Sequence, residues 1–459
     1  MLLTLIRKEV VSHVLSLRFG VTFLLFILLV FASLFVTTQE YQRDKAQFHA
    51  SQRNAAAQLD EILKEDDPER RVERLFEDEG ILDAVPVPPL ASVSRGLMTI
   101  MPPAVNTTAM GVRSVDVEAG HNPLTGLLRA PDLVYVVSVV LSLLAILFAF
   151  DSICGEKESG TLRLMLSNAV PRDLVLLGKW IGGYVVLVVP FLIAAVGGLG
   201  YAWWRGTLEL TGETPARIAC LLGVACLYIS VFFTLSMAIS SFTHRAATSL
   251  FVCLLVWTVW ILVIPNLAPV ISKIAMPTPS IDKVNAEKQA VDDEIRLRVG
   301  RLSLVSGEVM YGKKIQREID KLNQEGERRK LQWDRFLAES TRRQTRLAQT
   351  LGRLSPSVCW TYCAVSLMDT GPSLYQRLDE AVGRLRRDMT EYGQMHERSW
   401  HATGKFPEMV AEQVPHLQMP QQNFKDAFSL ALTDVLILAV LNVVFFMAAF
   451  LLFLRYDVR

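Results

Sequence analysis

Six long apolar blocks decide what this chain can fold into. Each holds about 20 predominantly apolar residues, the length that an α-helix needs to cross a hydrocarbon core of roughly 30 Å. The blocks are residues 19–38, 132–150, 180–203, 218–240, 250–272 and 427–454. Because the backbone must satisfy its own hydrogen bonds inside a bilayer, each block is expected to be a helix. Burial inside a soluble protein explains one such block but not six, so the sequence predicts an all-α polytopic membrane protein with six transmembrane helices.

Lysine and arginine in the short connecting segments predict how the chain crosses the membrane. Ten basic residues fall on one side, namely Arg7, Lys8, Arg18, Lys157, Arg163, Arg172, Lys179, Arg245, Arg455 and Arg459, and two on the other, Arg205 and Arg217. Basic residues concentrate on the cytoplasmic side, so we expect a multi-pass protein of the cell inner membrane with both termini and residues 151–179 in the cytoplasm. The long segments 39–131 and 273–425 then lie outside.

The chain begins with an amphipathic stretch, residues 1–18. Its apolar residues are Leu2, Leu5, Ile6, Val10, Val14 and Leu17. This spacing fits a helix that lies in the cytoplasmic membrane interface. The apolar run that follows is too long for a cleaved signal peptide and lacks a small-residue cleavage site, so we interpret it as an uncleaved first span.

Both long external segments carry helical patterns. Residues 39–79 read as helix that ends at Gly80, and a proline-rich loop follows. From Ile281 to about Leu351 apolar residues again recur at helical intervals. The glycines that interrupt this second pattern predict breaks or a hairpin, and they are Gly300, Gly307, Gly312 and Gly326. Another helix is expected from about Ser373 to Trp400, opened by Pro372. Almost no strand signal is present, so we predict a mainly helical extracytoplasmic module.

The sequence lacks the motifs of an enzyme. The phosphate-binding pattern GxxxxGK[ST] is absent, because Gly178 and Lys179 are followed by Trp180. No HExxH or GxSxG motif occurs, and the seven histidines show no metal-ligand spacing. Cys359 and Cys363 lie four residues apart on one helical face, where a disulfide would be strained, so paired burial is expected. With a net charge of +1, the chain is not expected to bind nucleic acid. We therefore predict no catalytic residues, no metal site and no cofactor in this chain.

Residues 151–179 form a polar connection between two spans. Gly160 separates an acidic turn, which contains Glu156 and Glu158, from the segment TLRLMLS. In that segment Leu162, Met165 and Leu166 fall on one face of a short helix. Pro171 favours a further helix start. The pattern predicts a compact helical knob below the membrane, which can fill a cleft on a cytoplasmic partner. A plain amphipathic connector is the alternative.

This stretch resembles the coupling helix of ATP-binding-cassette (ABC) transporter permeases of the second export type. The matching residues are Glu156, Glu158, Gly160, Thr161, Leu162, Leu166, Ser167, Pro171, Arg172, Gly178 and Lys179. The stretch around Arg7, Lys8 and Glu9 resembles the amphipathic elbow of that family, and the six-span plan agrees. The large helical insertion before the last span resembles a subgroup that includes relatives of permeases linked to gliding motility and to copper-enzyme maturation.

The resemblance implies partners. A separate cytoplasmic ABC ATPase subunit would bind and hydrolyse ATP with Mg, and would dock on the 151–179 segment. A second copy of the permease, or a related one, would complete the membrane part beside membrane lipid. Two functions remain open: export of a substrate, or transmission of force through the external helices to an extracytoplasmic protein without transport. The predicted knob argues against a third, a static anchor or receptor.

Two polar residues of the last span are further candidates. Asp434 lies within the apolar block 427–454, where a carboxylate is costly and therefore a functional hypothesis by default. Asn442, eight residues on, shares roughly its face. We consider both for a translocation path, with a bond between neighbouring helices as the alternative for Asp434. Pro190, Pro265 and Pro269 are expected to kink the third and fifth spans.

Overall fold

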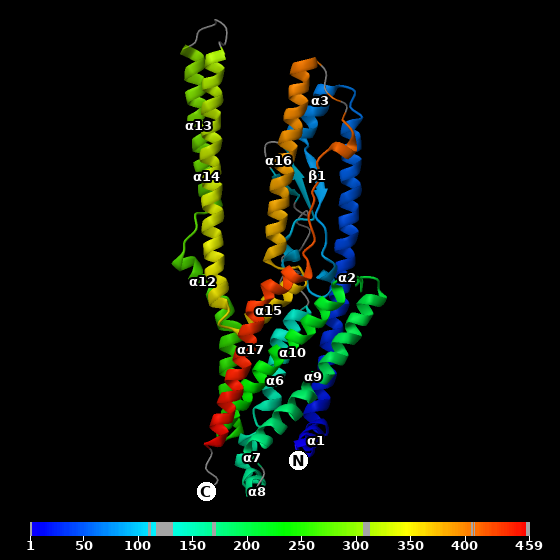
Figure 1. Cartoon of the computed structure of the whole chain (residues 1–459), viewed down its shortest axis with the longest axis vertical. Helices are drawn as coiled ribbons and strands as arrows, with labels where there is room; N and C mark the ends of the chain where they lie inside the picture. The colour runs from blue at the N-terminus through cyan, green and yellow to red at the C-terminus, as the bar shows by residue number, and fades with distance from the viewer. Residues whose placement is uncertain are drawn as a thin grey trace. The chain divides into compact units, whose positions relative to one another are not determined.

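The computed structural model describes residues 2–108, 112–115, 132–167, 171–305, 313–404, 407 and 409–455. The chain divides into two compact units. One unit comprises Met1–Trp257 and Cys359–Arg459, and the other comprises Thr258–Val358. The first unit holds the candidate coupling segment, and the second holds a long helical hairpin (Figure 1).

Within the described residues, six helices are long and apolar enough to cross a membrane, which confirms the predicted all-α fold. They run over Phe19–Leu63, Leu133–Glu158, Arg172–Trp204, Thr214–Phe242, Ala246–Ala275 and Phe424–Leu454. Four of these are single helices, namely α2 (Leu17–Leu63), α9 (Arg172–Trp204), α10 (Thr214–Phe242) and α17 (Phe424–Leu454). The second membrane helix contains α5 (Leu133–Tyr135), η4 (Val136–Leu141) and α6 (Ser142–Ala149). The fifth consists of α11 (Ala246–Thr258), η5 (Val259–Val263) and α12 (Ile264–Ala275).

Helix α10 is largely enclosed by its neighbours. Tyr228, Phe232 and Phe233 on this helix are at most 1% exposed. Its polar side chains bond to neighbouring backbones: the Tyr228 hydroxyl donates to the Ser138 carbonyl at 2.7 Å, and Ser236 Oγ donates to the Ile146 carbonyl at 3.3 Å. Such pairing is what buried hydroxyls need in a medium without water.

One of the three prolines expected to kink a membrane helix follows a local change of helix geometry. Pro265 lies four residues after Ile261, which belongs to the π-helical turn η5. Proline has no N–H to donate to the carbonyl four residues earlier, and its ring clashes with that carbonyl. The wider π-helical turn before Pro265 accommodates the ring. Pro190 lies inside α9 and Pro269 inside α12.

Helix α2 continues far beyond the length of a span. It has 47 residues, which corresponds to roughly 70 Å, and it ends at Leu63. The sequence predicted helix from residue 39 to about 79, and the structure adds a short break. Helix α3 (Pro68–Glu73) starts afresh with Asp67 as its N-cap, and η1 (Arg74–Asp78) completes the stretch. Gly80 follows with φ of +71°, so the predicted end at this glycine is confirmed.

A small sheet was not predicted. Strands β1 (Ile81–Ala84), β2 (Ala104–Thr107) and β3 (Val112–Val115) pair antiparallel in the order β1–β2–β3. Ile81 lies opposite Thr107, and Ala104 lies opposite Val115. The expectation of loop in this region was wrong because each strand has only four residues and prolines surround them, so the alternation that identifies a strand is too short to stand out.

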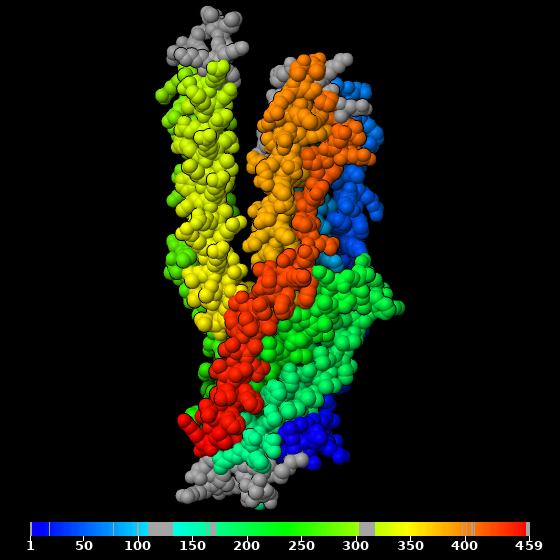
Figure 2. Space-filling view, viewed as in Figure 1, coloured from blue at the N-terminus to red at the C-terminus, as the bar shows by residue number. Residues whose placement is uncertain are grey.

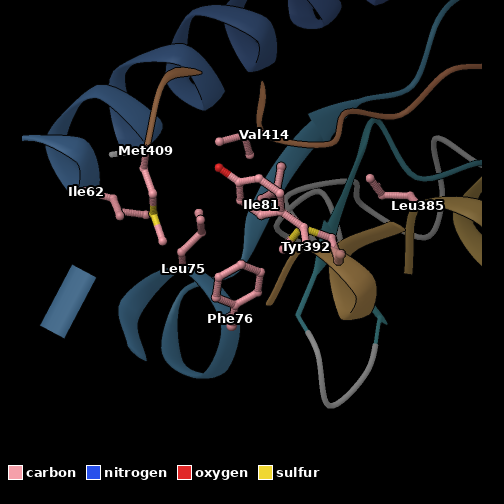
Figure 3. Packing of buried hydrophobic residues seen from close by; sticks show 9 residues of the cluster. Ile62, Leu75, Phe76, Ile81, Leu385, Tyr392, Met409 and Val414 are labelled. Carbon is pink, nitrogen blue, oxygen red and sulfur yellow. The ribbon is translucent and has the colours of Figure 1, made fainter. Parts of the chain in front are cut away.

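The part of the first unit at the Leu63 end of α2 has its own apolar core. The end of α2, η1, β1 and α16 (Pro372–Thr403) contribute side chains to it, and the 409–417 segment closes it (Figure 3). Its members are Ile62, Leu75, Phe76, Ile81, Leu385, Met389, Tyr392, Met409 and Val414. Helix α16 begins at Pro372, as predicted from the sequence.

The second unit is built around the antiparallel pair α13 (Ile281–Val305) and α14 (Lys313–Gly352). Interhelical ion pairs join Lys288 to Asp334 and Arg329 to Glu294. The predicted breaks at Gly300 and Gly326 were wrong, because both residues lie inside helices. A Cβ on Gly326 would lie 3.1 Å from Ile295 Cγ1, so this glycine permits close helix packing. Gly307 and Gly312 lie outside the described residues.

Candidate functional site

The 151–179 connection forms two short helices before α9 begins. Helix α7 spans Cys154–Glu158 and α8 spans Thr161–Ser167. Gly160 separates them with φ of +76°, a left-handed conformation that favours glycine. No atom lies within 4 Å of a Cβ placed on this residue, so backbone conformation alone selects glycine here. The predicted break and the predicted short helix are both confirmed.

One face of α8 is anchored in the protein. Leu162 is fully buried, and Met165 packs against the same cluster. The buried members of this cluster come from α9, α10 and α17 as well as from this connection, and they are Ile153, Leu162, Val175, Leu176, Met237, Ala238, Ala449 and Phe453. Leu166 and Ser167 form the last turn of α8. The core therefore ties the segment to three membrane helices.

The remaining face is open to solvent. Glu158, Ser159, Thr161, Pro171 and Asp173 are exposed. Leu164 is 69% exposed, although it is apolar. Leu164 is thus an exposed apolar side chain surrounded by polar and acidic ones.

Helix α1 (Leu2–Val14) packs closely on the start of α9, and two glycines make this possible. A Cβ on Gly178 would lie 3.1 Å from Leu5 Cβ, and one on Gly182 would lie 2.7 Å from Glu9 Cβ. The second distance is shorter than real Cβ contacts allow. Figure 2 shows the N-terminal helix against α9 at one end of the molecule's membrane helices. Helices α7 and α8 and the end of α17 lie at the same end (Figure 1).

A buried ion cluster joins α1, α7 and α9. Lys179 Nζ lies 2.8 Å from Glu156 Oε1 and 3.2 Å from Glu9 Oε1, and only 5% of the lysine side chain is exposed. Lys8 Nζ lies 3.7 Å from Glu156 Oε1 and 3.8 Å from Glu9 Oε1 at the outer edge of the cluster. Glu156, predicted as a partner contact, therefore points toward α9 and α1. Two carboxylates and two ammonium groups balance each other, which is what charges removed from water require.

Hydrogen bonds between side chains and backbone groups tie α7 to the end of α10, to the turn that follows and to the start of α11. Ser240 Oγ accepts hydrogen bonds from the backbone N–H groups of Ile153 and Cys154 at 3.1 and 3.0 Å, which caps the start of α7. Lys157 Nζ donates to the carbonyl of Thr243 at 3.2 Å. Glu158 Oε2 accepts from the Ala246 N–H at 3.1 Å, at the start of α11.

Arg172 extends these connections to the last helix. Its Nη1 donates to the Leu454 carbonyl at 2.7 Å, at the C-terminal end of α17, where a cation is favourable. Together with the preceding contacts, this bond connects the 151–179 segment to the ends of α9, α10, α11 and α17. Pro171 caps the start of α9, as expected from the sequence.

Asp434 lies in the interior of the protein. It is 1% exposed and belongs to a buried face of α17 with Ala427, Ala431 and Leu438. Asn442 is half-buried on the same helix. The translocation role of both residues stays a prediction.

The sequence reasoning missed the pairing of Lys179 with Glu9. The signal was present: a lysine inside an apolar helix needs a carboxylate, and Glu9 is the acidic residue of the amphipathic N-terminal stretch. Ser240 and Lys157 gave no comparable signal, because their partners are backbone groups. Among the described residues, no group of three or more His, Cys, Asp or Glu side chains is arranged to hold a metal ion.

Comparison with known proteins identifies a family and two relatives of this chain. The family model for ABC-2 family transporter proteins matches residues 3–458. A probable ABC transporter permease protein NosY of Pseudomonas aeruginosa PAO1 is 33% identical over 128 residues, which cover 27% of this chain and 45% of that protein. A probable ABC transporter permease protein NosY of Stutzerimonas stutzeri is 43% identical over 54 residues, covering 12% of this chain and 20% of that protein. The chain thus spans less than half of the length of these relatives.

Proposed function

The chain belongs to the ABC-2 family of transporter proteins, and on that premise we propose that it is the permease subunit of an ATP-driven exporter. A separate cytoplasmic ABC ATPase would dock on the 151–179 segment and hydrolyse ATP with Mg. A second copy, or a related permease, would complete the membrane part. The distribution of basic residues supports an inner-membrane topology with both termini in the cytoplasm.

This proposal is supported mainly by the 151–179 segment, which has one side buried against the membrane helices and the other side exposed. One side is fixed by the buried Leu162, and the other exposes Leu164. An exposed apolar side chain on a short, rigidly held helix suits insertion into a cleft of a partner protein, where its burial contributes to binding.

The buried contacts supply a path for motion. A push on α7 and α8 reaches α9 through Lys179, α10 and α11 through Lys157 and Glu158, and α17 through Arg172. Helix α1 moves with them because Glu9 shares the same lysine. Such contiguous packed contacts are what coupling between a nucleotide cycle and membrane helices requires.

The family match and the permease relatives favour transport over the force-transmitting alternative that the sequence left open. The substrate of this chain would leave the cytoplasm along the interface between two permeases. Asn442, which is half-buried on α17, is the polar side chain that we propose for this path, whereas the burial of Asp434 within this chain favours the alternative role, a bond between neighbouring helices.

Partner docking can be tested on the exposed side of α8. We expect the Leu164→Asp variant to lose most of its stimulation of the cognate ATPase in proteoliposomes, by about tenfold or more, because a charge replaces an apolar contact. Leu210→Asp is the matched control, since Leu210 is 48% exposed and lies in the connection between α9 and α10, away from α7 and α8. Unchanged stimulation and co-purification in the Leu164→Asp variant would rule out this docking surface.

A further inference from the structure

The end of α14 carries an excess of positive charge. Residues 335–353 contain five arginines and one carboxylate, namely Arg335, Arg342, Arg343, Arg346 and Arg353 against Glu339. Glu339 forms an ion pair with Arg343. The neighbouring stretch 262–281 adds Lys273 and contains no aspartate or glutamate. This region therefore attracts anions.

Two hydrogen bonds fix how deep the end of α14 reaches along the fifth membrane helix. Gln344 Nε2 donates to the carbonyl of Met276, just after the helix Ala246–Ala275 ends, at 2.8 Å. Ser357 Oγ donates to the carbonyl of Trp260 at 3.3 Å, well inside that helix. The chain from Gln344 to Ser357 thus descends beside a membrane-crossing helix from its end toward its middle. Arg342, Arg343 and Arg346 flank Gln344, so they lie at the level of the membrane surface.

Exposed apolar side chains adjoin these arginines on the membrane side. Those on α12 are Leu267, Val270, Ile271 and Ile274, each at least 45% exposed, and Leu354 near the end of α14 is 66% exposed. Guanidinium groups above exposed aliphatic side chains match the layering of a phospholipid, with phosphates above acyl chains. A soluble acidic protein would satisfy the charges and leave the aliphatic surface uncovered.

The arginines also face away from the helix pair. Arg335, Arg342 and Arg346 follow each other at intervals of seven and four residues, which places them on one face of α14. Gln344, which donates to the Met276 carbonyl, lies on the opposite face. Arg342 and Arg346 are exposed, and within the part of the chain that the structure describes neither has an ion-pair partner.

We propose that Arg342, Arg343 and Arg346 bind the phosphate of an anionic phospholipid headgroup in the leaflet at the Met276 end of the fifth membrane helix. Arginine suits this ligand because its planar guanidinium donates two parallel hydrogen bonds to phosphate oxygens. The inference requires that the helix Ala246–Ala275 crosses a membrane. It does not depend on the ATPase partner or on transport.

The test is a lipid titration of the purified full-length protein in detergent, read by native mass spectrometry. Phosphatidylglycerol is the probe, and phosphatidylcholine is the neutral reference. We expect Arg342→Gln/Arg343→Gln/Arg346→Gln to reduce the affinity for phosphatidylglycerol by roughly tenfold or more, because each basic residue near an anionic surface contributes about a factor of five. Affinity for phosphatidylcholine should not change, and the triple lysine variant should keep most of the preference.

The matched control removes three positive charges elsewhere on α14. Arg317→Gln/Lys321→Gln/Arg328→Gln alters exposed residues nearer the other end of the helix and should leave the lipid preference intact. An equal loss in this control would mean that net charge alone attracts the lipid, and would overturn the site. So would an unaltered preference in the first variant. Displacement of the lipid by inorganic phosphate at similar concentration would show a free-anion site and refute the lipid assignment.

Discussion

Lys179 Nζ lies between two carboxylates that are far apart in the sequence, 2.8 Å from Glu156 Oε1 and 3.2 Å from Glu9 Oε1. One side chain thereby joins the N-terminal helix, the short α7 and the start of α9. The side chain is nearly fully buried, so its charge depends on these partners.

Replacing Lys179 by Met should destabilise the protein by about 3 kcal/mol, because two carboxylates would remain without their common cation. The measurement is the free energy of unfolding of the purified protein in detergent. A cycle with Glu156→Gln isolates the pair: the double variant should lose less than the sum of the two single losses. Strictly additive losses would show that the two residues do not interact.

Gly182 sets how closely α1 approaches α9. Gly182→Ala should lower stability by about 1–3 kcal/mol, since the new Cβ would lie 2.7 Å from Glu9 Cβ and displace the helix. Gly197→Ala is the control on the same helix, with no atom within 4 Å of its Cβ. This control should be neutral or slightly stabilising, because alanine favours helix over glycine. Equal melting temperatures for both variants would contradict the close approach.

His416 should make the part of the first unit at the Leu63 end of α2 pH-sensitive. Its Nδ1 lies 3.5 Å from Asp83 Oδ1, and this carboxylate raises the pKa of His416 above the ordinary 6.5, although burial opposes the shift. The stability from this pair is then fully present below pH 6.5 and is lost as the pH rises through the raised pKa of the folded state.

An NMR titration of His416 checks the direction of this shift. Asp83→Asn should lower the pKa of His416, whereas Asp78→Asn, at the exposed end of η1, should leave it unaltered. A pKa that does not respond to the Asp83 substitution would exclude this carboxylate as the cause.

Cys359 and Cys363 should resist modification in the native protein. Neither forms a disulfide, both are fully buried in α15 (Pro356–Leu367), and Cys363 Sγ lies 3.5 Å from the Ala431 carbonyl. A maleimide reagent should therefore label neither residue until detergent denaturation exposes them, as peptide mass spectrometry can establish. Labelling at the native rate of a half-buried thiol such as Cys220 would contradict their burial.

The sequence predicted those features that depend on neighbouring residues. Long apolar runs identified the membrane helices, Pro372 identified the start of α16, and Gly160 identified the break between α7 and α8. Each of these signals acts within a few residues, through hydropathy or through allowed backbone angles.

Features that depend on distant residues escaped prediction. Lys179 and Glu9 are 170 residues apart, so only the folded chain shows that they meet. Gly326 was expected to mark a break or a hairpin, but it lies inside α14, where a side chain would crowd Ile295 of the neighbouring helix. The strands of the small sheet are likewise defined by their partners, with Ile81 opposite Thr107.

The uninterrupted course of α2 has a mechanical consequence. A rigid rod of roughly 70 Å magnifies rotation about one of its tips: a tilt of about 5° at Leu17 sweeps Ile62 sideways by about 6 Å. Ile62 belongs to the apolar core at that end of the helix, so the whole core would swing as one body. A tilt that is too small to disturb the packing near Leu17 therefore produces a large displacement at the other end of the helix.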